Sequence, residues 1–220
     1  MPEFTQEIAS DIGAHSEAIL RQTFNVAIEH VRSLAPAREN PFKARSRRKV
    51  HFYIAYSHDP VATHMIERSR DTGPSDGSDA FTITSEINGE LITYVFLLVD
   101  RFALDEKGKQ RPDAFVRLVT ALAHEVYGNV ADQLKLKLGE PPIMDAAMRI
   151  ADEQRAFTAS IAFLKRYKRS RLSKIVDAEH LKQAIVREEE ALEFWKKQKP
   201  QACAPQVFVF GGRSGVRRLR

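Results

Sequence analysis

The strongest constraint on the fold is a two-residue turn, Asn88-Gly89, that lies between two segments with strand character. Residues 81–87 alternate apolar and polar side chains, and residues 91–99 form a nearly continuous apolar run. A two-residue hairpin loop requires a positive φ at both central positions, which Asn and Gly tolerate. The sequence therefore predicts an antiparallel hairpin in the first half of the chain.

Apolar residues recur with helical spacing over most of the remaining chain. They predict helices over residues 4–34, 113–138, 143–167 and 173–198. Strand-forming residues predict one strand at 50–56 before the hairpin and a last one at 207–210. Residues 36–49, with two prolines and a basic run, are expected to form an exposed connector.

This order of elements predicts an α+β fold, in which an N-terminal helical segment packs on a small, mostly antiparallel sheet. The 220 residues are enough for one domain of good size, which we place at residues 1–212, with a basic tail at 213–220. With 43% hydrophobic and 29% charged residues, the composition excludes wholesale disorder.

Several classes of protein are excluded by simple features of the chain. No apolar run approaches the ~18 residues of a membrane span. The first fifteen residues carry acids instead of a basic patch and an apolar stretch, so we expect no secretory signal. The single cysteine, Cys203, excludes an intramolecular disulfide and a multi-cysteine zinc site, and it favours a reducing, cytoplasmic location.

A His-Glu pair, His124-Glu125, lies on the helix predicted directly after the hairpin. Such a pair is half of a zincin motif, in which the His binds zinc and the Glu is the general base toward the metal-activated water. The second ligand of that motif lies four residues after the first, where this chain has Gly128. Asn129 follows at ~140° around an ideal helix, so a one-residue π-bulge is needed to return it to the metal side.

A second site breaks the apolar pattern of the following helix. Glu153 lies three residues after Ile150 and four before Phe157, on the same stripe as these core residues. A carboxylate on such a stripe is costly unless it is paired or bound to a metal. We therefore expect Glu153 to be a further zinc ligand, with an ion pair to Arg117, Arg149 or Lys137 as the alternative.

These two segments resemble motifs of a known family. Residues 123–129 are similar to the HExxGH motif of dipeptidyl peptidase III, and residues 152–156 to its EExRA motif. More broadly, the chain resembles a gluzincin, a zinc metallopeptidase. The resemblance implies a zincin-like fold, with His124 and Glu153 as metal ligands and Glu125 as general base. It covers only about two helices of a chain that is much shorter than that enzyme.

Asn129 occupies the place of the motif's second histidine, and an amide oxygen is a poor zinc ligand beside imidazole. Three outcomes follow. Zinc binds weakly through His124, Glu153, Asn129 and water. Alternatively, another histidine completes the site, or the site has lost its metal and a pseudoenzyme scaffold remains. The candidate histidines for completing the site are His51, His58, His64 and His180.

If the site is active, the expected reaction is peptide-bond hydrolysis, with a peptide or protein substrate paired along an edge strand within residues 91–99. Tyr127 is a candidate for stabilising the oxyanion, with packing in the core as the alternative. The competing hypothesis is a degenerate metallopeptidase that binds peptides or proteins without cleaving them.

The chain also carries basic runs, at residues 43–49, 165–174 and 213–220. Few aromatic residues lie among them, so we interpret these charges as solvated surface, and a basic module that binds nucleic acid is the less favoured alternative function. The net charge of +5 permits an acidic partner without requiring one.

Overall fold

The structure is a computed structural model that describes residues 1–36, 40–44, 48–68, 78–135 and 146–199. The predicted strand at residues 207–210 and the basic tail at 213–220 lie outside these ranges. Among the described residues, no helix combines the length and the apolar character needed to cross a membrane.

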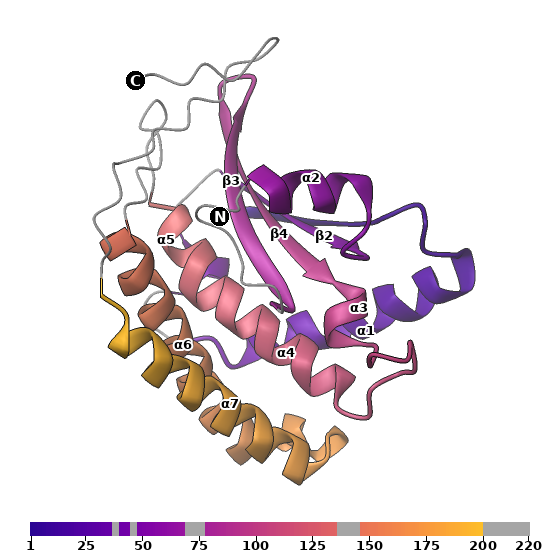
Figure 1. Cartoon of the computed structure of the whole chain (residues 1–220), viewed down its shortest axis with the longest axis vertical. Helices are drawn as coiled ribbons and strands as arrows, with labels where there is room; N and C mark the ends of the chain where they lie inside the picture. The colour runs from indigo at the N-terminus through magenta and orange to yellow at the C-terminus, as the bar shows by residue number, and fades with distance from the viewer. Residues whose placement is uncertain (37–39, 45–47, 69–77, 136–145, 200–220) are drawn as a thin grey trace.

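Four strands form one mixed sheet in the order β1-β2-β4-β3 (Figure 1). The strands are β1 (Glu3–Ile8), β2 (Lys49–Ala55), β3 (Ala80–Ile87) and β4 (Glu90–Leu98). β2 pairs in parallel with both β1 and β4, and only β3 and β4 are antiparallel. The prediction of a mostly antiparallel sheet was therefore wrong. Between β1 and β2 the chain returns through a long helix, and such a crossover aligns the two strands in parallel.

The hairpin prediction is confirmed, because β3 and β4 pair around Asn88 and Gly89 with φ values of 52° and 77°. β4 lies inside the sheet between β2 and β3, so the edge strand beside it is β3. Our expectation of an edge within residues 91–99 was wrong, because the parallel pairing with β2 occupies the other side of β4.

The four predicted helical segments are present with shifted ends. They are α1 (Ala14–Ser33), α4 (Ala114–His124) with its continuation α5 (Ala131–Gln133), α6 (Ala146–Arg169) and α7 (Ala178–Lys197). Two further helices, α2 (Pro60–Arg68) and α3 (Val99–Phe102), were not predicted. A π-helical segment, η2 (Glu125–Val130), joins α4 to α5, and short 3-10 turns lie at η1 (Pro41–Lys43) and η3 (Arg171–Ile175).

The N-terminal segment differs from the prediction, because its first part is β1 and the helix begins only at Ala14. Side chains along β1 alternate between exposed and half-buried, a period of two that is too short to stand out beside the helical stripe that follows. Within the expected connector, Pro41 and Phe42 are buried, although we expected exposed residues there.

The elements form layers about the sheet (Figure 1). One face packs against α1 and α4, and α6 and α7 cover α4 on its far side; side chains from all four helices share one core with this face. The opposite face carries α2 and a smaller apolar cluster that includes Tyr53, Phe81 and Phe96. The fold class is α+β, as predicted.

Candidate functional site

The helix that carries the His-Glu pair changes its winding at that pair. α4 ends at His124, and π-helical hydrogen bonding runs from Glu125 to Val130. A π-helix bonds each residue to the fifth one along, so it inserts one extra residue per turn. The structure therefore contains the bulge that Asn129 requires to turn toward the side of His124.

Gly128 lies at the closest contact between the two predicted motifs. A Cβ built at this position would stand 2.3 Å from the Cβ and 2.5 Å from the Cα of Ala156 on α6. Real Cβ atoms essentially never approach other atoms so closely, so this crossing of η2 and α6 requires glycine. Because α6 lies so close, Glu153, one turn before Ala156, reaches His124.

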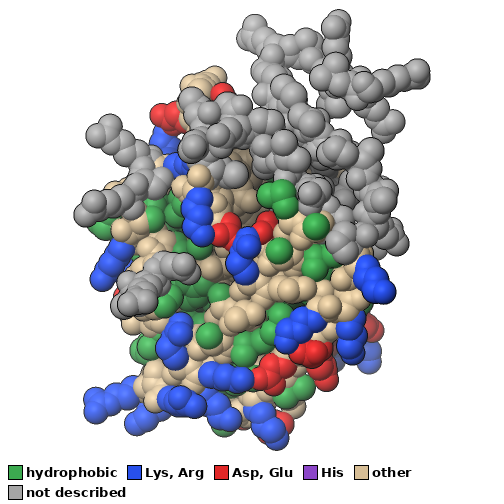
Figure 2. All heavy atoms as spheres, turned by 90° about the vertical axis from the view of Figure 1, so that its left-hand side faces the viewer, with side chains coloured by type: hydrophobic (Ala, Val, Ile, Leu, Met, Phe, Trp, Pro, Cys, Tyr) green, Lys and Arg blue, Asp and Glu red, His purple; other side chains and the backbone are tan. Residues whose placement is uncertain are grey.

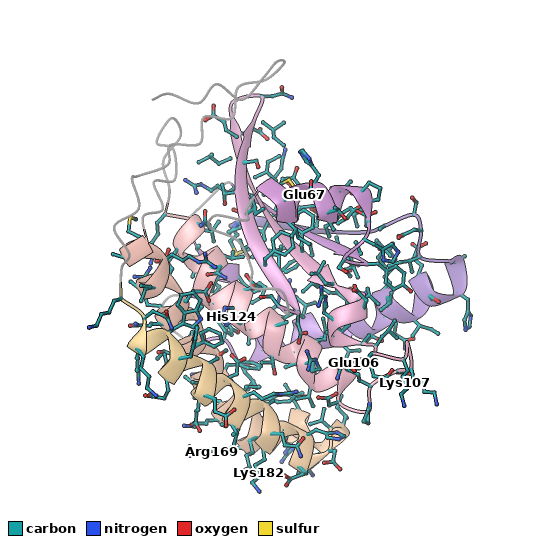
Figure 3. All side chains as sticks on the ribbon, in the orientation of Figure 1. Glu67, Glu106, Lys107, His124, Arg169 and Lys182 are labelled. Carbon is teal, nitrogen blue, oxygen red and sulfur yellow. The ribbon has the colours of Figure 1, made fainter. Side chains whose placement is uncertain are left out.

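His124 lies where α4 faces α6 and α7 (Figure 3). Its Nε2 is 3.7 Å from Oε2 of Glu153, and its Nδ1 is 3.8 Å from Oε2 of Glu188 on α7. These are ion-pair distances, longer than a hydrogen bond. The edge of the ring meets Phe157, with 4.5 Å between centroids. The structure thus brings the predicted pair His124 and Glu153 together and adds a second carboxylate.

The proposed alternative partners of Glu153 are engaged elsewhere or lie outside the description. Arg117 forms an ion pair with Asp79, and the guanidinium of Arg149 lies over the ring of Trp195. Lys137 is outside the described residues.

Glu125 is the buried carboxylate of the site, with 3% of its surface exposed. Its Oε2 accepts hydrogen bonds from Oγ1 of Thr82 at 2.6 Å and from Nδ2 of Asn129 at 2.7 Å. Burial raises the pKa of the Glu125 carboxyl, and the nearby His124 opposes that shift in part. Asn129 is therefore committed to Glu125 through its amide nitrogen, and only its amide oxygen has the chemistry of a metal ligand.

The charges around His124 are unbalanced. Burial lowers the pKa of His124, but Glu153 and Glu188 outweigh burial and raise it to about 10. With Glu125, three carboxylates surround one imidazole in a largely buried place. Buried charge of one sign favours a compensating cation, and the imidazolium supplies only part of that compensation.

The pair of donors fits a zinc ion in type and spacing. Two ligands of a tetrahedral zinc, each about 2.0–2.1 Å from the metal, lie about 3.4 Å apart. The 3.7 Å between Nε2 of His124 and Oε2 of Glu153 is close to that value. Within the described part of the chain, however, no group of three or more His, Cys, Asp or Glu side chains forms a metal-binding set.

The other histidines that could have completed the site have other surroundings. His51 contacts Thr5 and Glu7 on the sheet, and His58 stacks on Tyr56 near Asp11. His64 is exposed on α2, and His180 lies in the first turn of α7.

Tyr127 is not brought to His124. Its hydroxyl donates a hydrogen bond to the carbonyl of Val31 on α1, and its ring lies 5.9 Å from that of Phe163. Burial raises the pKa of this phenol. This arrangement corresponds to the packing alternative for Tyr127, so we leave it out of the proposed catalytic set.

Sequence reasoning missed Thr82, Ser160 and Glu188. Glu188 begins an acidic run at residues 188–190, but it also follows the buried Ala184 by four residues and the buried Ile185 by three. That spacing, the same one that singled out Glu153, places Glu188 on the apolar stripe of α7.

The exposed face over α6 and α7 bears mixed charge. Lys and Arg side chains are interspersed with Asp and Glu over its middle and gather along its lower edge (Figure 2). The basic run at 165–174 contributes Lys165, which forms an ion pair with Glu189 on α7.

Comparisons of the chain with models of protein families, with curated proteins and with solved structures find no match.

Proposed function

We propose that the chain is a zincin-like, gluzincin-type metallopeptidase that binds zinc and hydrolyses peptide bonds. The observation that carries this proposal is the convergence of His124 and Glu153, from two different helices, at a spacing suited to one metal ion. The π-bulge and the contact of Gly128 with Ala156 support it, because they are what the two motifs need in order to meet.

In this proposal Nε2 of His124 and the carboxylate of Glu153 hold the zinc, with the amide oxygen of Asn129 as a weak third donor. A bound zinc would polarise the substrate carbonyl and lower the pKa of a water molecule toward ~7. Glu125 accepts the proton of that water. Its raised pKa suits the role, because a general base works best when its pKa approaches the working pH.

The edge strand β3 offers a place for an extended peptide. Within the described residues β3 pairs only with β4, so its outer edge can accept backbone hydrogen bonds from a substrate. Thr82 of β3 touches Glu125, which places this edge directly beside the proposed general base.

Metal content tests the proposal. We expect the purified protein to bind one equivalent of zinc, or of cobalt as a spectroscopic substitute, and Glu153→Gln to weaken binding at least tenfold. The matched control is Glu189→Gln, an exposed carboxylate on α7 that should leave binding unchanged. A wild-type protein that takes up no metal at micromolar concentration overturns the proposal.

Asn129→His probes the departure from the family motif. If position 129 faces the metal, the imidazole should raise zinc affinity by at least tenfold, because it replaces an amide oxygen. An unchanged affinity in a folded variant would show that residue 129 serves Glu125 alone.

A second candidate function is a metal-free scaffold that binds peptides or proteins without cleaving them. It is favoured by the incomplete donor set and by the fact that His124 already lies between two carboxylates. It predicts that chelator changes neither the unfolding midpoint nor the affinity for peptides.

A further inference from the structure

Glu188 enters the site from α7, a helix that belongs to neither predicted motif. Its side chain is 13% exposed, and its Oε2 lies 3.8 Å from Nδ1 of His124. The same oxygen accepts a hydrogen bond from the hydroxyl of Ser160, a fully buried residue of α6. Glu188 is therefore held in place from one side and faces the histidine on the other.

The two carboxylates beside His124 lie on different ring nitrogens. Glu153 faces Nε2 and Glu188 faces Nδ1, and the two nitrogens of an imidazole point in different directions. One metal ion bound to the ring can therefore share only one of these carboxylates. The other carboxylate is left to accept the N–H of the opposite nitrogen.

The position of Glu125, the proposed general base, indicates which ring nitrogen of His124 faces the metal. Glu125 lies on η2, and η2 crosses α6 at Gly128 and Ala156, one turn from Glu153. Glu153 therefore comes from the helix that packs directly against the segment carrying the general base, whereas Glu188 comes from α7. Glu188 is already bound by Ser160 and lies behind the ring. The metal side is then the Nε2 side.

We propose that Glu188 is a positioning residue whose carboxylate pairs with the Nδ1–H of His124, at an ion-pair distance of 3.8 Å, and thereby aims Nε2 at the metal. Ser160 fixes the carboxylate for this task. The metal-binding part of this inference rests on the proposed function, whereas the pairing of Glu188 with Nδ1 does not. Carboxylates behind metal-bound histidines orient the ring and raise its basicity, and their loss commonly weakens metal binding by about 10–100-fold.

The first experiment measures cobalt and zinc affinity by competition with a chromophoric chelator. We expect Glu188→Ala to weaken binding about 10–100-fold. Glu188→Gln, which keeps an acceptor oxygen but loses the charge, should recover part of that loss, and Ser160→Ala should weaken binding less. The matched control is Glu189→Gln, because the neighbouring Glu189 points to Lys165 on the surface. Thermal unfolding in chelator verifies that every variant is folded.

The second experiment needs no metal. In protein treated with chelator and labelled with ¹⁵N-histidine, the Nδ1 proton of His124 should give a downfield resonance protected from exchange. Glu188→Ala should shift it upfield or broaden it, Glu188→Gln should shift it less, and Glu189→Gln should leave it in place.

The two readouts separate the two hypotheses. If wild-type protein binds no metal while the Nδ1 resonance responds to Glu188, the proposed function fails and the pairing holds. If metal binds and Glu188→Ala changes neither affinity nor the resonance, the positioning role is overturned on its own. If neither metal binding nor the resonance response is seen, both proposals fail.

Discussion

Two histidines of the interior, the buried His30 and the partly buried His124, have opposite surroundings in the same molecule. His30 on α1 is 8% exposed, and its Nδ1 lies 3.0 Å from the hydroxyl of Tyr167, a neutral partner. Burial lowers the pKa of His30, and nearby Glu29 opposes the shift only in part. Around His124 the carboxylates reverse the direction and raise the pKa to about 10.

The contrast separates a histidine that serves packing from a candidate functional one. A neutral imidazole with one neutral partner satisfies its polar atoms and serves packing. An imidazole with a carboxylate at each nitrogen has more negative charge around it than it can neutralise, and such clusters of perturbed titratable groups are typical of functional sites. The four predictions below test this contrast.

The largest effect is expected from His124→Gln in metal-free protein. Removing the imidazolium leaves the carboxylates of Glu125, Glu153 and Glu188 without a counter-charge inside the protein. The free energy of unfolding should therefore fall by about 3 kcal/mol. Urea unfolding in chelator measures it. A change below about 0.5 kcal/mol, the range of ordinary surface substitutions, would show that the cluster is far less charged than we infer.

Gly128→Ala should break the contact that holds Glu153 beside His124. The added methyl meets both the side chain and the backbone of Ala156. We therefore expect the free energy of unfolding to fall by about 2 kcal/mol and metal binding to weaken. The control is Gly13→Ala, where a Cβ would meet nothing within 4 Å. Equal stability of the two variants would contradict the close crossing of η2 and α6.

His30→Phe should lower the free energy of unfolding by less than His124→Gln does. The aromatic ring can still pack against Phe115 and Tyr167, and only one neutral hydrogen bond is lost, which corresponds to about 1 kcal/mol. The same urea experiment applies, and metal affinity should remain that of the wild type. An altered metal affinity would show that the two regions are coupled.

The smallest effect concerns pH. Because the pKa of His30 lies below its ordinary value of 6.5 in the folded state, the unfolded chain binds a proton first as the pH falls. Stability attributable to His30 is therefore complete above pH 6.5 and is lost as the pH falls toward the lowered pKa. His30→Gln should flatten this part of a stability curve measured between about pH 7 and 5, and an unchanged slope would contradict the lowered pKa.

The local parts of the fold could be predicted from the sequence. The hairpin follows from Asn88-Gly89, and the helical half follows from apolar spacing. The parallel pairing of β2 with β1 depends on how α1 returns across the sheet, and its pairing with β4 depends on where the hairpin docks. No local sequence pattern records either arrangement. We did not predict β1, because an alternating pattern of six residues is a weak signal beside a helix of twenty residues.

For the candidate site, spacing identified the residues that break an apolar stripe. It singled out Glu153, and the structure brings that carboxylate to His124. The same spacing argument, applied to α7, would have identified Glu188. We overlooked it because Glu189 and Glu190 follow it and make the segment look like an exposed acidic run. The contact of Thr82 with Glu125 could not be predicted from the sequence, because it depends on which strand forms the edge of the sheet.

The glycine at position 128 has a consequence for recognising related chains. Because its clash partner includes the backbone Cα of Ala156, shrinking that residue to glycine would not make room for a side chain at 128. Position 128 therefore tolerates no exchange, whichever polar residue follows it. A search for distant relatives of this chain should therefore require glycine at this position and leave the residue after it unrestricted.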